Sequence, residues 1–396
     1  MKIAQIAPLF ESVPPRLYGG TERVVSYLTE ELVRQGHQVT LFASADSMTS
    51  AEFVPCAPRA LRLDPTVRDP IPHLMLMLDM VRERTGDFDI LHFHLDYLHF
   101  PLFRAHSGRT LTTLHGRQDL PDHVSFYARF HDMPLVSISQ AQRHPLPGAN
   151  FVATVHHGLP CDLHKPVFST GSYLAFLGRI SPEKRPDRAI AIARAAGMPL
   201  RIAAKVDKVD EAYFREVIAP MLDQPGVEFI GEINERAKDE FLGQAAALLF
   251  PIDWPEPFGM VMIEAMACGT PVLAFSHGSV GEIVEDGVTG RIVADVAEAV
   301  RALPDVLALD RRAIRMRFEE RFSAARMAKD YVRVYRRILR GRWRDDAPIA
   351  ASSTRSARLA PAPAGNGSAH LRLDGRMAAI EPARPPLPRS TQGETV

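Results

Sequence analysis

Two glutamates with a fixed spacing lie in the stretch WPEPFGMVMIEAMACGTPVLAF, residues 254–275. Glu256 stands between two prolines just before an apolar segment, and Glu264 lies inside that segment. Buried carboxylates are unfavourable unless they are paired or hydrogen-bonded. A salt bridge explains Glu264 poorly, because its neighbours are nearly all apolar. Carboxylates are also good acceptors for sugar hydroxyls, so contact with a sugar or a ribose is another way to account for them.

The segment after Glu256 is predicted to form a helix over residues 258–267, with Pro255 and Pro257 holding Glu256 outside it. The first turn of a helix leaves amide groups without partners and carries a partial positive charge. These amides are suited to phosphate oxygens, and they belong to Phe258, Gly259, Met260 and Val261.

A second stretch whose residues could bind a ligand is GRISPEKRPDRAI, residues 178–190. Arg179 ends a predicted strand, and Lys184 lies at the start of the next helix. Ligands of open α/β sheets bind at the carboxyl ends of strands. The planar fork of an arginine and the point charge of a lysine suit a diphosphate. Taken alone, a solvated basic turn explains the stretch equally well, and Arg185 and Arg188 are expected at the surface.

A glycine pair, Gly19 and Gly20, lies in YGGTERVV between a predicted strand and helix. Bare backbone amides at such a place attract anions. The pattern is not GxGxxG, so a dinucleotide-binding fingerprint is absent. A plain loop and a phosphate-binding loop both remain open at this point.

The elements that must position these residues alternate along the chain. Short apolar runs are typical of buried strands, and segments such as residues 21–36 and 185–197 have helical periodicity. This alternation predicts an α/β protein with doubly wound parallel sheets. The predicted strands are residues 2–7, 37–44, 89–94, 109–116 and 134–140, followed by 172–180, 199–206, 227–233, 246–252 and 271–275.

The length of 396 residues suggests two domains. We expect one Rossmann-like domain over residues 1–165 and a second over 166–325, facing each other across a cleft. Residues 326–344 have helical periodicity. Residues 345–396 are rich in Pro, Ala, Ser and Arg without periodicity, which predicts a disordered tail.

The amino-acid composition argues against several classes of protein. The 47 basic and 47 acidic residues balance, so bulk charge gives no reason to expect nucleic-acid binding. The three cysteines form no CxxC pair, which argues against a disulfide framework or a structural zinc site and fits a reducing compartment. The N-terminal apolar run is too short for a signal peptide, and no run reaches membrane-spanning length. We therefore expect a cytoplasmic protein, and leave peripheral membrane contact open.

Over residues 1–342 the chain resembles the retaining glycosyltransferases of family 4, which have the GT-B fold. The resemblance rests on YGGTERVV, TTLHG, VSISQAQR, HHGLP, FLGRISPEKRPDRAI, FIGEI and PEPFGMVMIEAMACGTPVLAF. In the last of these, Glu256 and Glu264 match the E-x7-E signature of the family. The resemblance implies two Rossmann-like domains and a last helix that crosses back to the first domain.

The resemblance also implies residue roles. Residues matching Arg179 and Lys184 bind the donor diphosphate, the one matching Glu264 holds the ribose, and the one matching Glu256 contacts the donor sugar. His115 matches a histidine near the reacting carbon, and the glycine loop approaches the phosphates when the cleft closes. The predicted catalytic residues are Arg179, Lys184, Glu256 and His115, and the predicted donor-binding residues are Gly19, Gly20, Phe258, Gly259, Met260, Val261, Glu264 and Gly231.

The implied reaction is a front-face substitution through an oxocarbenium-like state, in which the leaving phosphate helps to deprotonate the acceptor hydroxyl. It requires no enzyme nucleophile and relies on stabilisation of the leaving group. We expect no metal and no cofactor. The donor is a nucleotide sugar, UDP-linked by default with GDP and ADP open, whose base contacts residues 229–233. The acceptor is a glycan, a lipid or a small molecule.

Two regions depart from the family pattern. Residues 155–166 stand where many relatives have Asn-Gly-Val-Asp, so His156, His157 and Asp162 receive no firm role, and residues 55–80 match nothing interpretable. Trp254 and Cys268 are expected to be packing residues.

Rival functions remain open. His92 and His94 would share one face of a strand, and with Asp96, His99 and His115 they suggest a metal-dependent hydrolase. The DFDI stretch at residues 87–90 resembles a metal-binding DxD signature, but is better explained as a helix–strand junction. A nucleotide-sugar epimerase and a non-catalytic binding protein also remain open.

Overall fold

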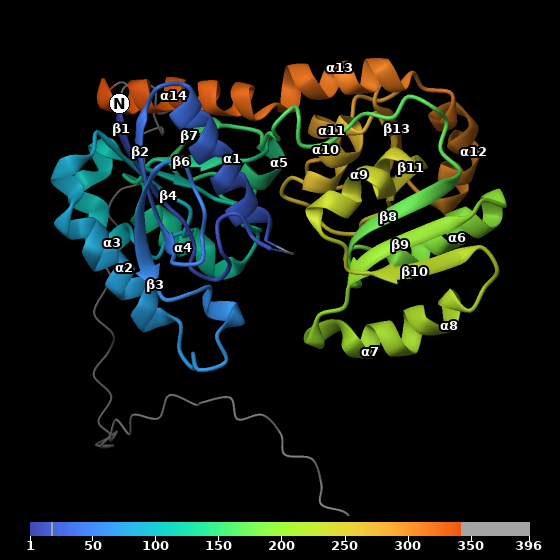
Figure 1. The fold of residues 1–396 in the computed structure, drawn as a ribbon, viewed down its shortest axis with the longest axis horizontal. Coiled ribbons are helices and arrows are strands. Elements are labelled where there is room, and N and C mark those ends of the chain that lie inside the picture. Colours follow the sequence, from blue (N-terminus) through green and yellow to red (C-terminus); the bar gives the residue numbers. More distant parts are fainter. Residues whose placement is uncertain (17–18, 342–396) are drawn as a thin grey trace, which may run out of the picture. The chain divides into compact units, whose positions relative to one another are not determined.

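The computed structural model describes residues 1–16 and 19–341. Its N-terminal domain is built on a seven-stranded sheet of order β3-β2-β1-β4-β5-β6-β7 (Figure 1). All neighbouring strands in it run parallel. The strands are β1 (Lys2–Ile6), β2 (Gln38–Ser44), β3 (Glu52–Ala57), β4 (Ile90–Phe93), β5 (Thr110–Thr113), β6 (Leu135–Ser137) and β7 (Phe151–Thr154).

The connections in this domain are mainly helical. They are α1 (Gly20–Arg34), α2 (Ile71–Glu83), α3 (Phe100–Phe103), α4 (Pro121–Arg129) and α5 (Gln140–Arg143), with short 3₁₀ turns at Leu61–Leu63, Thr85–Asp87 and Arg104–Arg109. Helix α1 has the predicted apolar stripe, and its Val24, Leu28 and Leu32 are buried against the sheet.

The C-terminal domain has a six-stranded parallel sheet of order β10-β9-β8-β11-β12-β13. Its strands are β8 (Tyr173–Arg179), β9 (Leu200–Lys205), β10 (Val227–Gly231), β11 (Ala245–Phe250), β12 (Val272–Phe275) and β13 (Gly290–Val293). Its helices are α6 (Pro186–Ala196), α7 (Glu211–Tyr213), α8 (Ala219–Leu222), α9 (Glu235–Gly243), α10 (Met260–Ala267), α11 (Val280–Ile283), α12 (Val296–Leu307) and α13 (Arg311–Phe322), with a 3₁₀ turn at Lys208–Asp210 and a π-helical turn at Phe214–Ile218.

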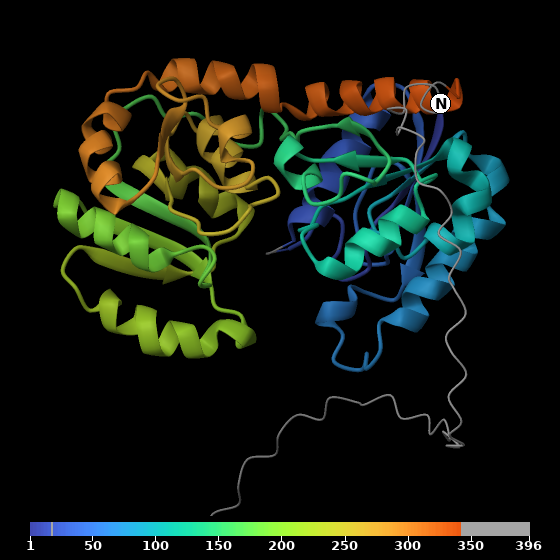
Figure 2. The same ribbon diagram turned by 180° about the vertical axis from the view of Figure 1, so that it is seen from behind.

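The last described helix, α14 (Ala324–Leu339), follows α13 but packs against the N-terminal domain (Figures 1 and 2). Met327, Tyr331 and Tyr335 on α14 are fully buried in one apolar cluster with Ile3 and Val24. The chain therefore returns to the domain where it began, and the two domains are connected both before β8 and after α13.

The prediction of an α/β fold with two Rossmann-like sheets is confirmed. The predicted tail, residues 345–396, lies outside the described residues. Among residues 1–16 and 19–341, none of the helices combines the length and the apolar character that a membrane-spanning segment requires.

Candidate active site

A cavity of about 680 Å³ lies where the carboxyl ends of both sheets meet. The N-terminal domain contributes residues that directly follow its strands, such as His94 after β4 and His115 after β5, and the C-terminal domain contributes Arg179 at the end of β8. Of the predicted site residues, the cavity is lined by Gly19, Gly20, His115, Arg179, Lys184, Glu256, Phe258, Gly259, Met260, Val261 and Glu264.

One predicted donor-binding residue is not part of the cavity wall. Gly231 ends β10 with a φ of +75°, and the neighbouring Glu232 and Ile233 line the cavity in its place. Phe229, from the same segment, instead packs with Phe214 in the core of the C-terminal domain, at a ring distance of 5.6 Å.

Arg179 is oriented by three carboxylates. Its Nη2 donates to Glu183 Oε2 at 3.0 Å, and its Nε and Nη1 lie 3.4 and 3.7 Å from carboxylate oxygens of Asp210 and Asp207. The side chain keeps about a third of its surface exposed, at 31%. A diphosphate that binds Arg179 must therefore compete with carboxylates that already hold the guanidinium.

Lys184 and Glu256 form an ion pair inside the cavity. The Lys184 ammonium also lies over the Trp254 ring, 5.0 Å from its centroid, and Trp254 Nε1 donates to Glu256 Oε2 at 3.0 Å. Trp254 therefore does more than pack, because it helps to hold the buried Glu256 carboxylate. No pattern in the sequence signals this hydrogen bond.

The backbone of Glu256 is fixed by a close approach of Gly278. A Cβ at Gly278 would lie 2.3 Å from the Glu256 backbone nitrogen, and Gly278 has a φ of +55°. The adjacent Ser279 amide donates to the Glu256 carbonyl at 3.0 Å. Only glycine fits at position 278 without moving Glu256.

Helix α10 begins at Met260, so the prediction of a helix from residue 258 was wrong by two residues. Gly259 adopts the left-handed conformation with a φ of +76°, which separates Phe258 from the helix. Phe258 is buried and packs edge-on against His157 at 4.8 Å. The first-turn amides with no partner among the described residues include those of Met260 and Val261, and both residues line the cavity.

Glu264 is buried on α10, with 5% of its side chain exposed. Lys238 Nζ, from α9, donates to Glu264 Oε1 at 2.7 Å. This contact is a salt bridge, so the sequence-based argument against a salt bridge at Glu264 was wrong. Lys238 also lines the cavity, and sequence reasoning missed it because it looks like an ordinary charge on a polar helix face.

His115 is linked to a buried chain of polar groups. Its Nε2 lies 2.8 Å from His94 Nδ1, and His94 Nε2 donates to Gln5 Oε1 at 2.8 Å. Because Gln5 Oε1 only accepts, His94 accepts from His115 through its Nδ1. Burial lowers the pKa of His115 to about 3, so its imidazole is neutral at neutral pH.

A metal-dependent hydrolase would lack two of its expected ligands, because His92 and His94 already use both ring nitrogens in hydrogen bonds. His92 uses Nδ1 toward the Tyr335 hydroxyl and Nε2 toward Thr113 Oγ1, both at 2.8 Å, and the two ring nitrogens of His94 are engaged as well. His99 Nε2 bonds Thr112 Oγ1 at 2.9 Å. Within the described residues, the groups spaced for a metal ion include neither His92 nor His94.

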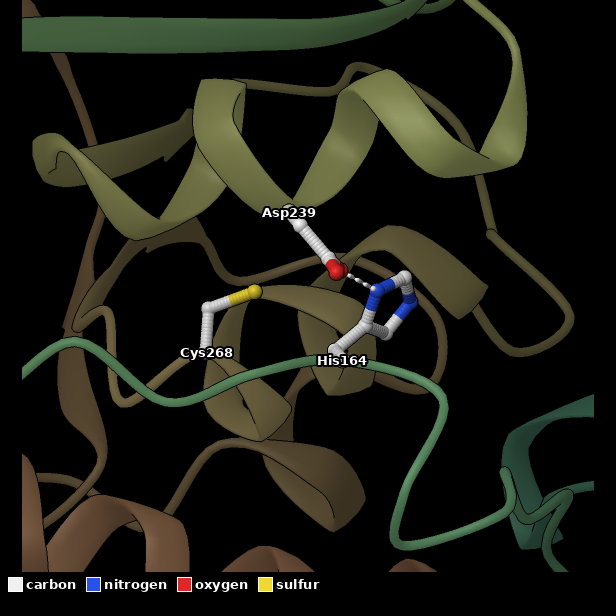
Figure 3. Close-up of side chains that lie close together, drawn as sticks. All are labelled: His164, Asp239 and Cys268. Carbon is white, nitrogen blue, oxygen red and sulfur yellow. Dashed lines mark hydrogen bonds and ion pairs between the residues drawn. The ribbon is translucent and has the colours of Figure 1, made fainter.

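The side-chain groups of the described residues that are spaced for a metal ion all include His164. Figure 3 shows His164 directed at Asp239, with the Cys268 sulfur facing the same space. His164 Nδ1 donates to Asp239 Oδ1 at 2.6 Å. Burial raises the pKa of the Cys268 thiol to about 12, so the neutral thiol is a small packing group at neutral pH. A buried hydrogen bond beside a packing thiol accounts for these residues, as expected for Cys268.

Of the remaining positions considered in the sequence, some line the cavity and others lie elsewhere. In the DFDI stretch, Asp89 accepts from the Lys2 amide at 2.8 Å, at the amino ends of β1 and β4, and so on the far side from the cavity. His157 lines the cavity and stacks on His115 at 5.3 Å. His156 pairs with Glu282 at 3.2 Å, and Asp162 is exposed.

Comparison with known proteins agrees with this architecture. A family model described as "Glycosyl transferases group 1" matches residues 164–322, and one described as "Glycosyltransferase Family 4" matches residues 18–141. A D-inositol 3-phosphate glycosyltransferase from Mycolicibacterium smegmatis is 26% identical over 354 residues, which cover 73% of this chain and 79% of the relative. A protein of the same name from Mycobacterium leprae is 34% identical over 160 residues, which cover 37% of this chain and 33% of the relative.

Among solved structures, AviGT4, a glycosyltransferase involved in avilamycin A biosynthesis, superimposes with a TM-score of 0.66. The two chains are 24% identical, and the match covers 86% of this chain and 98% of the other. At this identity the likeness establishes the fold alone.

Proposed function

The chain is a glycosyltransferase of family 4 with the GT-B fold, and we propose that it transfers a hexose from a nucleotide-sugar donor to an acceptor hydroxyl with retention of configuration. One observation carries the proposal. Two separate stretches of the C-terminal domain supply Arg179 with Lys184 and Glu256 with Glu264, yet all four line one cavity with His115 of the facing domain.

The donor diphosphate binds between Arg179, Lys184 and the first turn of α10. Cations and amide dipoles at this point stabilise the charge that develops on the leaving phosphate in the transition state. They supply the positive charge that a divalent metal ion supplies in other enzymes, and we propose that the reaction needs no metal or other cofactor.

The sugar and the ribose lie on either side of this diphosphate. Glu256 accepts from hydroxyls of the donor sugar once the phosphate competes for Lys184. Glu264 accepts from the ribose. Neutral His115 exchanges hydrogen bonds with the sugar near its reacting carbon, and with a pKa of about 3 it is a poor source of protons at neutral pH.

The bond changes take place on one face of the sugar. The bond from the anomeric carbon to the phosphate oxygen breaks, the bond to the acceptor oxygen forms on the same face, and the acceptor proton moves to the leaving phosphate. The donor is UDP-linked by default, with GDP and ADP as the other candidates, and the acceptor is a glycan, a lipid or a small molecule.

The test is thermal stability against a panel of nucleotides and nucleotide sugars. A ligand that binds only the folded state raises the melting temperature by mass action. We expect one nucleotide family to stabilise the wild type and to lose that effect in Arg179→Ala. The matched control is Arg188→Ala, because Arg188 pairs with Asp253 at 2.9 Å and does not line the cavity. Stabilisation by no nucleotide, or an equal shift in Arg179→Ala, contradicts the proposal.

A further inference from the structure

Lys238 bridges two carboxylates at the ribose end of the cavity. Its Nζ lies 2.7 Å from Glu264 Oε1 and 3.1 Å from Glu235 Oε2. No described residue donates to Glu264 Oε2. The contact from α9 thus fixes one oxygen of the Glu264 carboxylate and leaves the other without a protein partner among the described residues.

Glu235 connects this contact to the other domain. It forms an ion pair with Arg23 on α1 of the N-terminal domain, and Arg23 lines the cavity. Burial raises the pKa of Glu235, but the His164 ring, whose Nε2 lies 3.3 Å from Glu235 Oε1, and the charges of Lys238 and Arg23 outweigh it and lower the pKa to about 2. Glu235 is therefore ionised, and it is shared by cations from both domains.

The charges of this cluster balance. Three carboxylates, Glu235, Asp239 and Glu264, face three basic groups, Arg23, Lys238 and His164. Burial lowers the pKa of His164, but Glu235, Glu264 and Asp239 raise it above its ordinary value, which favours the protonated ring. Removing one member leaves a neighbouring charge without its partner in a largely buried place.

We propose that Lys238 and Glu235 are positioning residues for the ribose-binding Glu264, and that Arg23 couples their position to contact between the two domains. The inference rests on the proposed role of Glu264. Lys238 holds Oε1 so that Oε2 accepts from a ribose hydroxyl, Glu235 holds Lys238, and Arg23 holds Glu235 from the facing domain. Binding of the ribose and formation of the ion pair between the domains then stabilise each other.

The first experiment compares three probes: the nucleoside diphosphate that binds the wild type, its 2′,3′-dideoxy analogue, and inorganic pyrophosphate. We expect the wild type to prefer the ribose form roughly tenfold, as the loss of a hydrogen bond to a charged group implies. We expect Glu235→Gln and Lys238→Met to lose most of this preference for the ribose form. Their affinity for pyrophosphate should equal that of the wild type. Lys238→Arg, which keeps a cation, should retain the preference.

Two exposed residues of the same helix provide matched controls. Glu240→Gln and Arg236→Met change charge on α9 without touching the cluster, and both should keep the wild-type preference. Urea unfolding verifies that each variant is folded. A merely structural role lowers stability without changing the ratio between ribose and dideoxy probes, and that result overturns the inference.

A double-mutant cycle tests the coupling between domains. Arg23→Met and Lys238→Met each weaken binding of the nucleoside diphosphate, and together they should weaken it by less than the product of the single effects. If the loss of affinity in the double variant equals the product of the two single losses, Arg23 acts independently of Lys238. That result overturns the proposed coupling between the domains. If the wild type binds no nucleoside diphosphate, the proposed function itself fails. If it binds one with the ribose preference and Glu235→Gln behaves identically, only the inference fails.

Discussion

The ammonium of Lys184 is paired with the buried carboxylate of Glu256. These residues have separate proposed roles, Lys184 at the diphosphate and Glu256 at the sugar. Their pairing gives each charge a partner within the protein, so neither is left buried and unpaired. Donor binding then exchanges a protein ion pair for contacts to a ligand.

This pair predicts a stability pattern. Lys184→Met leaves the Glu256 carboxylate with the Trp254 indole as its remaining side-chain donor among the described residues. Because Lys184 is partly exposed, we expect a loss of about 2 kcal/mol in the free energy of unfolding, below the roughly 3–5 kcal/mol typical of a fully buried pair. The double variant Lys184→Met/Glu256→Gln should recover much of that loss but remain inactive. Urea unfolding and donor turnover measure the two effects, and a double variant as unstable as the single one argues against the pair.

A second prediction concerns Gly278, where an added Cβ would meet the backbone of Glu256. Gly278→Ala places a Cβ against that backbone at a positive φ, so we expect a loss of about 1–3 kcal/mol and weaker binding of the donor. Gly281→Ala, three residues later, meets nothing within 4 Å and should leave both quantities near wild type. Equal behaviour of the two variants in thermal unfolding and donor titration would show that the approach of Gly278 does not position Glu256.

The cluster around Glu235 predicts a pH dependence of stability. His164 has a raised pKa, so its contribution is complete below the ordinary value of 6.5 and is lost as the pH rises through the folded pKa. Glu235 has a lowered pKa, so its contribution is present above 4.5 and is lost as the pH falls toward about 2. We therefore expect the contribution of this cluster to stability to fall on both sides of roughly pH 4.5–6.5.

The variant that tests this is His164→Phe, with urea unfolding followed from about pH 4 to about pH 9. It removes the titrating ring, so the decline above pH 6.5 should become shallower than in the wild type, with Arg23, Lys238, Asp239 and Glu264 unchanged. An identical slope in both proteins assigns the decline to another group.

Metal dependence gives a further prediction. In the proposed mechanism Arg179 and Lys184 supply the cationic charge at the diphosphate, so treatment with EDTA followed by gel filtration should leave the rate of donor turnover unchanged. Magnesium or zinc added back should not raise it. Activity that is lost on chelation and restored by a metal would refute the metal-independent mechanism.

The interior strands could be predicted, whereas three edge strands could not. β1, β4, β8 and β11 lie between neighbours and show as continuous apolar runs. The strands that were missed, β3, β7 and β13, each lie at the edge of a sheet. β3 contains Pro55, which is tolerated at an edge but weakens a strand pattern.

The same distinction applies to the site. Arg179 ends β8 and Glu264 lies in the apolar helix α10, where a charge stands out against its surroundings. Lys184 and Glu256 lie in the short segments before α6 and α10, close to prolines that begin or precede these helices. Lys238 and Glu235 lie on α9 among other charges, where pairing across the fold leaves no local signal. His92 Nδ1 is hydrogen-bonded to the hydroxyl of Tyr335, which lies 243 residues later in the chain. Such contacts require the tertiary structure.

The most direct test of the central claim is the configuration of the sugar released from the donor. The protein is incubated with the nucleotide sugar that stabilises it, water serves as the acceptor, and NMR identifies the first anomer before mutarotation. We predict the anomer with the configuration of the donor, formed by the wild type and by Arg188→Ala but not by Arg179→Ala. The opposite anomer, or equal release by Arg179→Ala, would contradict a retaining transfer in this cavity.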